Sequence, residues 1–186
     1  GGLLAGKVGP VLGGVLLLLF VFGVGKAALM PVHFWLPNAM VAPTPVSALL
    51  HAVAVVKAGV FTIMKLAIYI FGLDMLSALP MTEVVLWVGC FSIVVASLIA
   101  LTKDNLKARL AYSTVSQLSY VTVGAMLANT AGATGAGLQI AMHAMAKITL
   151  FMCAGAIYVA TGKTEISQMR GLGRKMPIVF ICFFFT

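Results

Sequence analysis

Long apolar runs dominate the chain, and they do not alternate between apolar and polar residues as strands do. A membrane-spanning helix needs about 20 mainly apolar residues, so the runs predict five complete spans and the start of a sixth. The first span begins near Pro10 and extends to Met30 or on to Met40. The spans are Val11–Met30, Val46–Gly72, Met81–Leu101, Leu110–Ala128 and Gly135–Thr161, with a sixth starting at Pro177. The pattern therefore predicts an all-α, polytopic transmembrane helix bundle.

The composition supports this class. The chain has 186 residues, 62% hydrophobic and 9% charged, with a mean hydropathy of +1.12. Soluble domains are about 45–50% apolar and about 25% charged. Twelve Lys and Arg stand against four Asp and Glu, a formal charge of +8. In a soluble protein this excess would suggest nucleic acid, but so apolar a chain indicates a lipid bilayer and no nucleic-acid partner.

Two basic loops are expected to orient the bundle. They are separated by two predicted crossings, so they lie on the same side of the membrane. Because cytoplasmic loops carry an excess of Lys and Arg, that side is predicted to be cytoplasmic. The loops hold seven of the twelve basic residues: Lys103, Lys107, Arg109, Lys163, Arg170, Arg174 and Lys175.

Three further lysines, Lys26, Lys57 and Lys147, fall inside apolar runs. A lysine at the centre of a bilayer costs about 2.5–3.5 kcal/mol on insertion scales. Extension of the side chain to the interface would avoid this cost and suits Lys65, near a span end. Lys57 and Lys147 are closer to the middle, so they are expected to face the bundle interior, water or a counter-charge.

Histidines accompany two of these lysines. His143 and Lys147 are four residues apart and share one helical face, while His51 precedes Lys57 by six residues, about 9 Å along a helix axis. Histidine titrates near neutral pH, and desolvation disfavours a buried ammonium. We therefore predict a proton relay; packing is the alternative for each histidine. Hydroxyl and amide groups could hold relay waters or join helices: Ser113, Thr114, Ser116, Gln117, Ser119 and Tyr120.

No carboxylate lies in the middle of a predicted span, since Asp74, Asp104 and Glu165 fall in loops and Glu83 lies near a span start. Both chain ends lie in or beside apolar sequence without a signal peptide. We therefore interpret residues 1–186 as one transmembrane proton-translocation domain, an internal fragment of a longer chain. The flanking segments are expected to supply an Asp or Glu that pairs with Lys26. The three cysteines have no metal or redox spacing, so no metal and no cofactor are expected.

Pro31 is predicted to break the first helix five residues after Lys26. Proline removes a backbone hydrogen bond and kinks a helix, and a break at membrane depth can serve an ion path. The alternative is an ordinary helix that ends near Met30, with Phe34 and Trp35 at the membrane interface.

Three motifs carry a family resemblance. They are residues 25–59 (GKAALMPVHFWLPNAM, APTPVSALLH and VKAG), residues 104–117 (DNLKARLAYSTVSQ), and His143 to Lys147 (HAMAK). Together they resemble the antiporter-like subunits shared by respiratory complex I and Mrp-type cation/proton antiporters. The match covers about residues 20–176, and the stretch after Lys147 looks most like the D-type subunits of Mrp antiporters. Asn38 stands where many members carry Asp.

The resemblance implies roles for the same residues. Lys26 matches a lysine that pairs with a glutamate of an earlier helix, Lys57 a central lysine, and Lys147 a bridging lysine. His51 and His143 match positions that link them. The implied function is H⁺ or Na⁺/H⁺ translocation in a hetero-oligomeric complex of other membrane subunits in the bacterial plasma membrane, with no redox site in this chain.

Other assignments stay open at this point. The chain could be a proton-pumping subunit of complex I or of a related membrane-bound hydrogenase. A solute transporter would place a substrate-sized pocket at the helix break. A purely structural subunit would tolerate Lys57→Ala without loss of flux.

Overall fold

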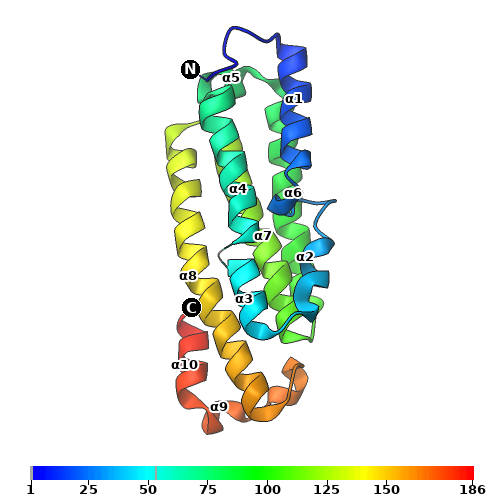
Figure 1. Cartoon of the computed structure of the whole chain (residues 1–186), viewed down its shortest axis with the longest axis vertical. Helices are drawn as coiled ribbons and strands as arrows, with labels where there is room; N and C mark the ends of the chain where they lie inside the picture. The colour runs from blue at the N-terminus through cyan, green and yellow to red at the C-terminus, as the bar shows by residue number, and fades with distance from the viewer. Residues whose placement is uncertain (1, 53) are drawn as a thin grey trace.

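The computed structural model describes residues 2–52 and 54–186, and for His51 and Ala52 it describes the backbone only. Within these residues the protein is helical, without a named strand (Figure 1). The longer helices are α1 (Pro10–Gly23), α3 (Thr44–Ala52), α4 (Val55–Lys65), α6 (Pro80–Thr102), α7 (Leu106–Met126), α8 (Thr130–Thr161) and α10 (Pro177–Phe185). The short ones are η1 (Gly25–Ala27), α2 (Trp35–Asn38), η2 (Ala39–Val41), the π-helical η3 (Leu66–Phe71), α5 (Leu73–Ala78), η4 (Ile166–Met169) and α9 (Leu172–Lys175).

Three segments of the described chain are long and apolar enough to cross a membrane: Thr44–Phe71, Pro80–Thr102 and Thr130–Thr161. They correspond to the second, third and fifth predicted spans, and α6 differs from its prediction by one residue at each end. Helix α7 has 21 residues, enough to span, but it carries many hydroxyl and amide side chains. The all-α, multi-pass prediction is confirmed, while the count of five spans stays a prediction.

The first predicted span is wrong at its C-terminal end. Helix α1 ends at Gly23, so the helix does not reach Met30, and the interruption begins at Val24, seven residues before Pro31. The following residues fold as the short η1 and a run of turns before α2 begins at Trp35. Ala27 to Met30 are buried there although they are not in an α-helix. Hydropathy could not distinguish this buried irregular segment from a continuing helix.

Local signals fix the ends of α7 and α8. Asn105 caps α7, since its side chain accepts a hydrogen bond from the backbone N–H of Ala108, and Asn129 caps α8 by accepting from that of Gly132. Helix α8 ends at Thr161 and is followed by Gly162, whose φ of 68° lies in the left-handed region that glycine adopts without strain. These caps place the predicted relay residues of α8 alongside α7.

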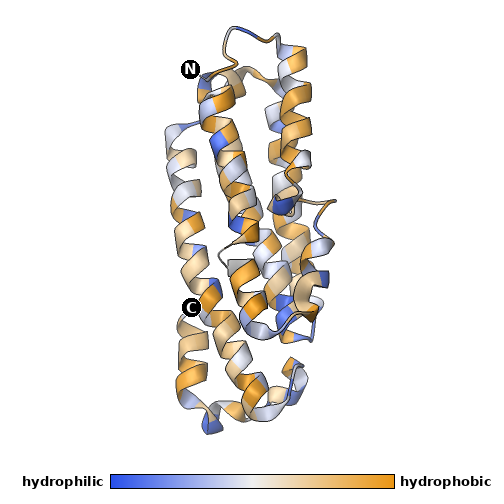
Figure 2. Cartoon of the chain, viewed as in Figure 1, coloured by the Kyte–Doolittle hydropathy of each residue, from blue (hydrophilic) through white to orange (hydrophobic). Residues whose placement is uncertain are grey.

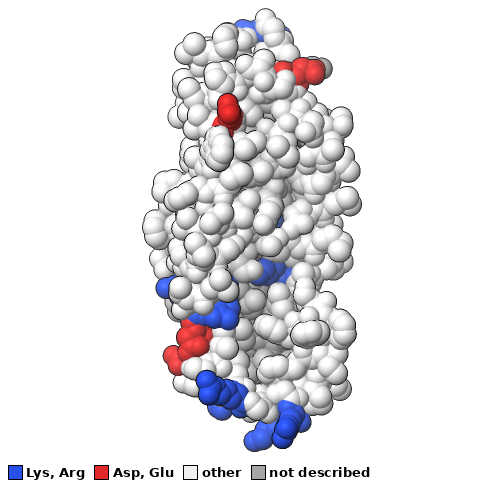
Figure 3. All heavy atoms as spheres, turned by 180° about the vertical axis from the view of Figure 1, so that it is seen from behind, with Lys and Arg blue, Asp and Glu red and all other residues white. Residues whose placement is uncertain are grey.

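The two basic loops lie side by side at one end of the bundle, as predicted. The backbone N–H of Leu106 donates to the Thr164 carbonyl at 3.0 Å, and that of Ile166 donates to the Asp104 carbonyl at 2.9 Å. Figure 3 shows Lys and Arg gathered at this end. Figure 2 shows that the helix surfaces above it are mainly apolar. We call it the basic end; α5 and the α7–α8 connection lie at the opposite end (Figure 1).

The core consists of two apolar clusters with α7 and α8 in common. The larger contains residues of α1, α4 and α6, together with α7 from Val115 onward and Ala136 of α8. The smaller lies toward the basic end and includes Leu106 and Leu110 of α7 and Phe151 of α8. The stretch of the α7–α8 interface between the two clusters holds polar side chains, and these form the candidate site.

Candidate proton-relay site

A lysine and a histidine meet directly inside the bundle. Lys57 on α4 places its Nζ 2.7 Å from Nδ1 of His143 on α8. The exposed fractions of these residues are 7% and 6%, so both are buried. When Lys57 is an ammonium, which has only donors, Nδ1 of His143 is assigned as the acceptor and the ring proton is assigned to Nε2. Nε2 is buried and has no hydrogen-bond partner among the described residues.

Lys147 lies one helical turn beyond His143 on the same face of α8. Its Nζ donates to the backbone carbonyl of Leu110 at 3.1 Å and to Oγ of Ser113 at 3.0 Å, both on α7. Lys147 is 3% exposed. A buried ammonium needs partners to offset its desolvation, and here a carbonyl and a hydroxyl supply them.

The acidic residues of the chain lie outside this site. All four acidic residues of the chain are exposed and lie at or near helix ends or in loops. Two buried lysines therefore lie close together with neutral partners only, among the residues described. Such an arrangement is costly in a bilayer, because like charges and desolvation both oppose two buried ammonium groups.

Two glutamines extend the line of polar side chains formed by Lys147 and His143, and we call this line the polar row. Nε2 of Gln139 on α8 donates to Oε1 of Gln117 on α7 at 2.5 Å. The sequence singled out Gln117 as a possible water-holding residue, but Gln139 was not predicted. The signal was available: Gln139, His143 and Lys147 recur every four residues and so share one helical face.

Two cavities follow this row. One, of about 330 Å³, is lined by Ser113, Gln117, Gln139, His143 and Lys147. The second, of about 450 Å³, is lined by the same two glutamines and by residues nearer the α7–α8 connection, including Gly124 and Gly132. Both have the polar lining and the volume needed to hold several water molecules.

The other predicted residues have different surroundings. Lys26 lies in η1, and its side chain is exposed. Its backbone packs closely against α4, where a Cβ on Gly59 would lie 2.5 Å from the Lys26 carbonyl carbon. Pro31 lies in the interrupted segment with its preceding peptide bond in cis. His51 lies in α3, and its side chain is outside the described residues.

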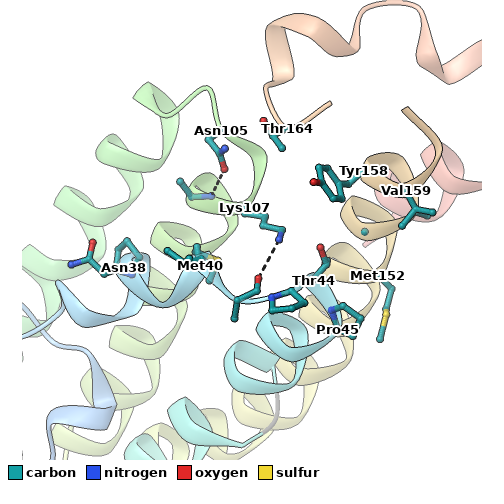
Figure 4. A pocket seen from close by; sticks show the side chains of 17 residues that line it. Asn38, Met40, Thr44, Pro45, Asn105, Lys107, Met152, Tyr158, Val159 and Thr164 are labelled. Carbon is teal, nitrogen blue, oxygen red and sulfur yellow. Dashed lines mark hydrogen bonds between the residues drawn. The ribbon is translucent and has the colours of Figure 1, made fainter. Parts of the chain in front are cut away.

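A larger hollow of about 1080 Å³ lies apart from the lysine site, beside residues 37–45 near the basic end (Figure 4). Lys107 reaches across it, with Nζ 3.4 Å from the Ala42 carbonyl and 5.9 Å from the centre of the Tyr158 ring. A pocket beside the interrupted segment is also what a solute transporter would show. None of the predicted relay residues lines it, so it does not account for the buried lysines.

In the described part of the chain, no group of three or more His, Cys, Asp or Glu side chains is placed to hold a metal ion. What the site can do is hold and move protons. Lysine, histidine, hydroxyl and amide groups form a polar row between apolar clusters, and with the apolar spans this defines an integral, multi-pass membrane protein.

Comparison with known proteins identifies the family. Residues 5–186 match the family model described as "NADH:quinone oxidoreductase/Mrp antiporter, TM". The chain belongs to this family of antiporter-like membrane subunits, as the motifs predicted. The narrower likeness to the D-type subunits of Mrp antiporters stays a prediction.

Curated relatives come from different complexes. The A/B-type subunit of a probable K(+)/H(+) antiporter of Rhizobium meliloti (strain 1021) is 39% identical over 173 residues, 91% of this chain and 16% of the relative. The NAD(P)H-quinone oxidoreductase chain 5 of Synechocystis sp. is 36% identical over 193 residues, 98% of this chain and 26% of the relative. The L-type subunit of the F(420)H(2) dehydrogenase of Methanosarcina mazei is 37% identical over 168 residues, 88% of this chain and 24% of the relative. The chain thus spans about a quarter or less of these relatives.

Solved structures agree. A polypeptide of the Mrp complex from Dietzia sp. DQ12-45-1b superposes with a TM-score of 0.76 at 32% identity, over 84% of this chain and 17% of that one. A polypeptide of the membrane-bound sulfane sulfur reductase, described as an archaeal respiratory membrane complex, superposes with a TM-score of 0.84 at 28% identity, over 97% of this chain and 37% of that one. The same helical arrangement therefore occurs in an antiporter complex and in a respiratory complex.

Proposed function

We propose that this chain translocates protons across a bacterial plasma membrane as part of an antiporter-like subunit of a multisubunit Mrp-type Na⁺/H⁺ or cation/proton antiporter. The 2.7 Å contact between Lys57 Nζ and His143 Nδ1, with Lys147 one turn further on, carries the proposal. These three residues are buried without a carboxylate partner in the described chain, so a positive charge on any of them is costly.

The relay works through the two ring nitrogens of His143. Lys57 gives a proton to Nδ1, and the proton already on Nε2 leaves toward the cavity that Lys147 lines. Lys147 accepts it there when its amine is neutral, and the carbonyl of Leu110 and the hydroxyl of Ser113 then stabilise the ammonium. Histidine suits this step because its ordinary titration lies near neutral pH.

Lys26 and His51 extend the relay on the α4 side. The Lys26 backbone touches Gly59, two residues from Lys57, so the two lysines belong to neighbouring positions of one path. A carboxylate from another part of a longer chain or from a neighbouring subunit pairs with the exposed Lys26 side chain. His51 links the path to Lys57 from the preceding helix, and the interruption at Pro31 gives water access to Lys26.

The test is flux in proteoliposomes that contain the intact complex, with proton and Na⁺ movement measured separately. Lys57→Ala and Lys147→Ala are expected to abolish proton flux. Lys65→Ala is the matched control, because Lys65 lies on the same helix as Lys57 but is exposed. Unchanged proton flux in either Lys57→Ala or Lys147→Ala, with the complex assembled, would refute the relay.

A second assignment has support from the relatives. Chain 5 of a quinone oxidoreductase aligns over 98% of this chain, so membership of complex I or of a related hydrogenase, as a proton-pumping subunit, is the competing proposal. Proton flux that needs quinone reduction, rather than a Na⁺ gradient, would move the assignment there. The relay residues would keep their roles in either complex.

A further inference from the structure

The polar row along α7 and α8 continues past the lysines toward the end opposite the basic loops. On α8 the inward-facing positions are Lys147, His143, Gln139, Ala136 and Gly132, and on α7 they are Ser113, Gln117 and Gly124. From Lys147 to Gly132 is 15 residues, about 22 Å at 1.5 Å per residue. This is most of the roughly 30 Å thickness of a bilayer's hydrocarbon core.

Gln117 and Gln139 stand where the two cavities of this row meet. Both residues line the 330 Å³ cavity that contains Lys147 and the 450 Å³ cavity beyond it. Their side chains are hydrogen-bonded to each other across the helix interface at 2.5 Å. Both are only partly exposed, and apolar residues of the larger cluster, including Val121 of α7 and Ala136 of α8, lie beyond them toward the far cavity.

We propose that the Gln117–Gln139 pair controls the passage of protons between the lysine site and the far cavity, so that the relay opens toward the end opposite the basic loops along the α7–α8 interface. This inference rests on the proposed proton translocation and adds its route. It assigns a positioning role to a pair of residues that the buried lysines do not single out.

The chemistry of the amide supports this role. A glutamine side chain neither gains nor loses a proton at neutral pH, but it offers two donors and an acceptor. While the two amides bond to each other they close the polar row. When the two amides turn to bond water instead, they support a hydrogen-bonded chain of water molecules between Lys147 and the far cavity.

Beyond the pair, space for water lies beside Gly135 and not between Gly124 and Gly132. The helices touch at Gly132, where a Cβ would lie 2.6 Å from the Gly124 carbonyl oxygen. One turn nearer the pair, no atom of the described chain lies within 4 Å of the position of a Cβ on Gly135, which also lines the far cavity. The cavity is therefore open beside Gly135.

The first experiment compares Gln139→Leu, Gln139→Glu and Thr149→Val in proteoliposomes of the whole complex. Gln139→Leu is expected to lower proton flux severalfold, and Gln139→Glu to restore it, because a polar side chain again holds water. Thr149→Val should keep the wild-type flux, since that hydroxyl lies on the same helix but bonds to the Met145 carbonyl of its own helix.

Lys147→Ala in the same assay separates the two proposals. If Lys147→Ala loses flux while Gln139→Leu keeps it, the route is wrong and the relay stands. If Lys147→Ala keeps flux, the proposed function itself fails. Equal losses in Gln139→Leu and Gln139→Glu would show a merely structural role for the pair and would also overturn the route.

A second measurement keeps the route testable if the Gln139 variants do not assemble. Gly135→Cys is made in a chain whose cysteines are replaced by serine, and a membrane-impermeant methanethiosulfonate is applied to each side in turn. The route predicts modification and loss of flux only from the side opposite the basic loops. Modification from the basic side, modification without loss of flux, or no modification from either side would overturn it.

Discussion

Lys57 and His143 are 86 residues apart in the sequence, yet Nζ and Nδ1 lie within 2.7 Å of each other. The contact joins α4 to α8 at a depth where both side chains are almost fully shielded from solvent. When Lys57 is charged, the contact requires Nδ1 of His143 to be the acceptor, since an ammonium cannot accept a hydrogen bond. Each of the two residues therefore depends on the other for a hydrogen-bond partner in the buried interior.

His143→Leu should therefore remove both stability and flux. The substitution leaves the Lys57 ammonium without its partner, and an unsatisfied buried polar group costs about 1–3 kcal/mol, more when it is charged. We expect a lower midpoint of thermal unfolding and no proton flux from the reconstituted complex. Met142→Leu, on the neighbouring exposed position of α8, should change neither quantity. A His143→Leu complex with wild-type stability would show that the contact does not form.

The sequence predicted the regular helices better than the irregular segment between them. Helix α6 could be placed within one residue because Pro80 and the polar residues after Leu101 bound a continuous apolar run. The end of α1 could not, because residues 24–30 stay mainly apolar while their backbone leaves the helix. Two side chains from outside residues 24–30 bond to this irregular backbone. Ser92 Oγ accepts from the Met30 backbone N–H, and Trp35 Nε1 donates to the Gly25 carbonyl.

The site was predictable along one helix and not across helices. Four-residue spacing correctly predicted that His143 and Lys147 share a face of α8. It could not show that His143 contacts Lys57, because that pairing depends on how α4 packs against α8. Gln139 follows the same four-residue spacing as His143 and Lys147, but its hydrogen bond with Gln117 could not be predicted, because that pairing also depends on how two helices pack.

Gly59→Ala should loosen the contact between the interrupted segment and α4. A Cβ there would lie 2.5 Å from the carbonyl carbon of Lys26 and 2.6 Å from the backbone nitrogen of Ala27, so backbone must move. Such overpacking costs about 1–3 kcal/mol. We expect a lower unfolding midpoint and reduced proton flux, because Lys26 is displaced from α4.

Gly137→Ala provides the matched control for that change. The nearest atom to a new Cβ on Gly137 is Met64 Cε at 3.5 Å, an ordinary contact. Alanine favours a helix over glycine by about 1 kcal/mol, so this variant should be as stable as the wild type or more so. Equal losses in both variants would contradict a specific close approach at Gly59.

Ser113→Ala should weaken the hold on the Lys147 ammonium. It removes one of two acceptors, at 3.0 Å, and leaves the Leu110 carbonyl at 3.1 Å. A lost hydrogen bond to a charged group costs about 1.5–3 kcal/mol. The expected result is slower proton flux with the complex still assembled. Ser119→Ala is the control on the same helix, because that buried hydroxyl bonds to the Val115 carbonyl of its own helix; equal effects would contradict the assignment.

Asp104 ties the two basic loops together in a way that should depend on pH. Its carboxylate accepts hydrogen bonds from Ser167 Oγ at 2.6 Å and from the Ser167 backbone N–H at 3.0 Å, and these bonds, with a smaller contribution from Arg109, lower the pKa of Asp104. A lowered pKa means that the carboxylate stabilises the folded loops fully above its ordinary pKa, and that this contribution disappears as the pH falls through the lowered value.

Hydrogen exchange at the Ser167 amide should therefore accelerate on acidification relative to the intrinsic rate. Asp104→Ala should show the faster exchange already at neutral pH, whereas Glu165→Ala, which removes an exposed carboxylate bonded to Gln168 within the same loop, should not. Protection of the Ser167 amide that is the same in Asp104→Ala and the wild type would show that the backbone bond from Ile166 to Asp104 holds the loops together without the carboxylate.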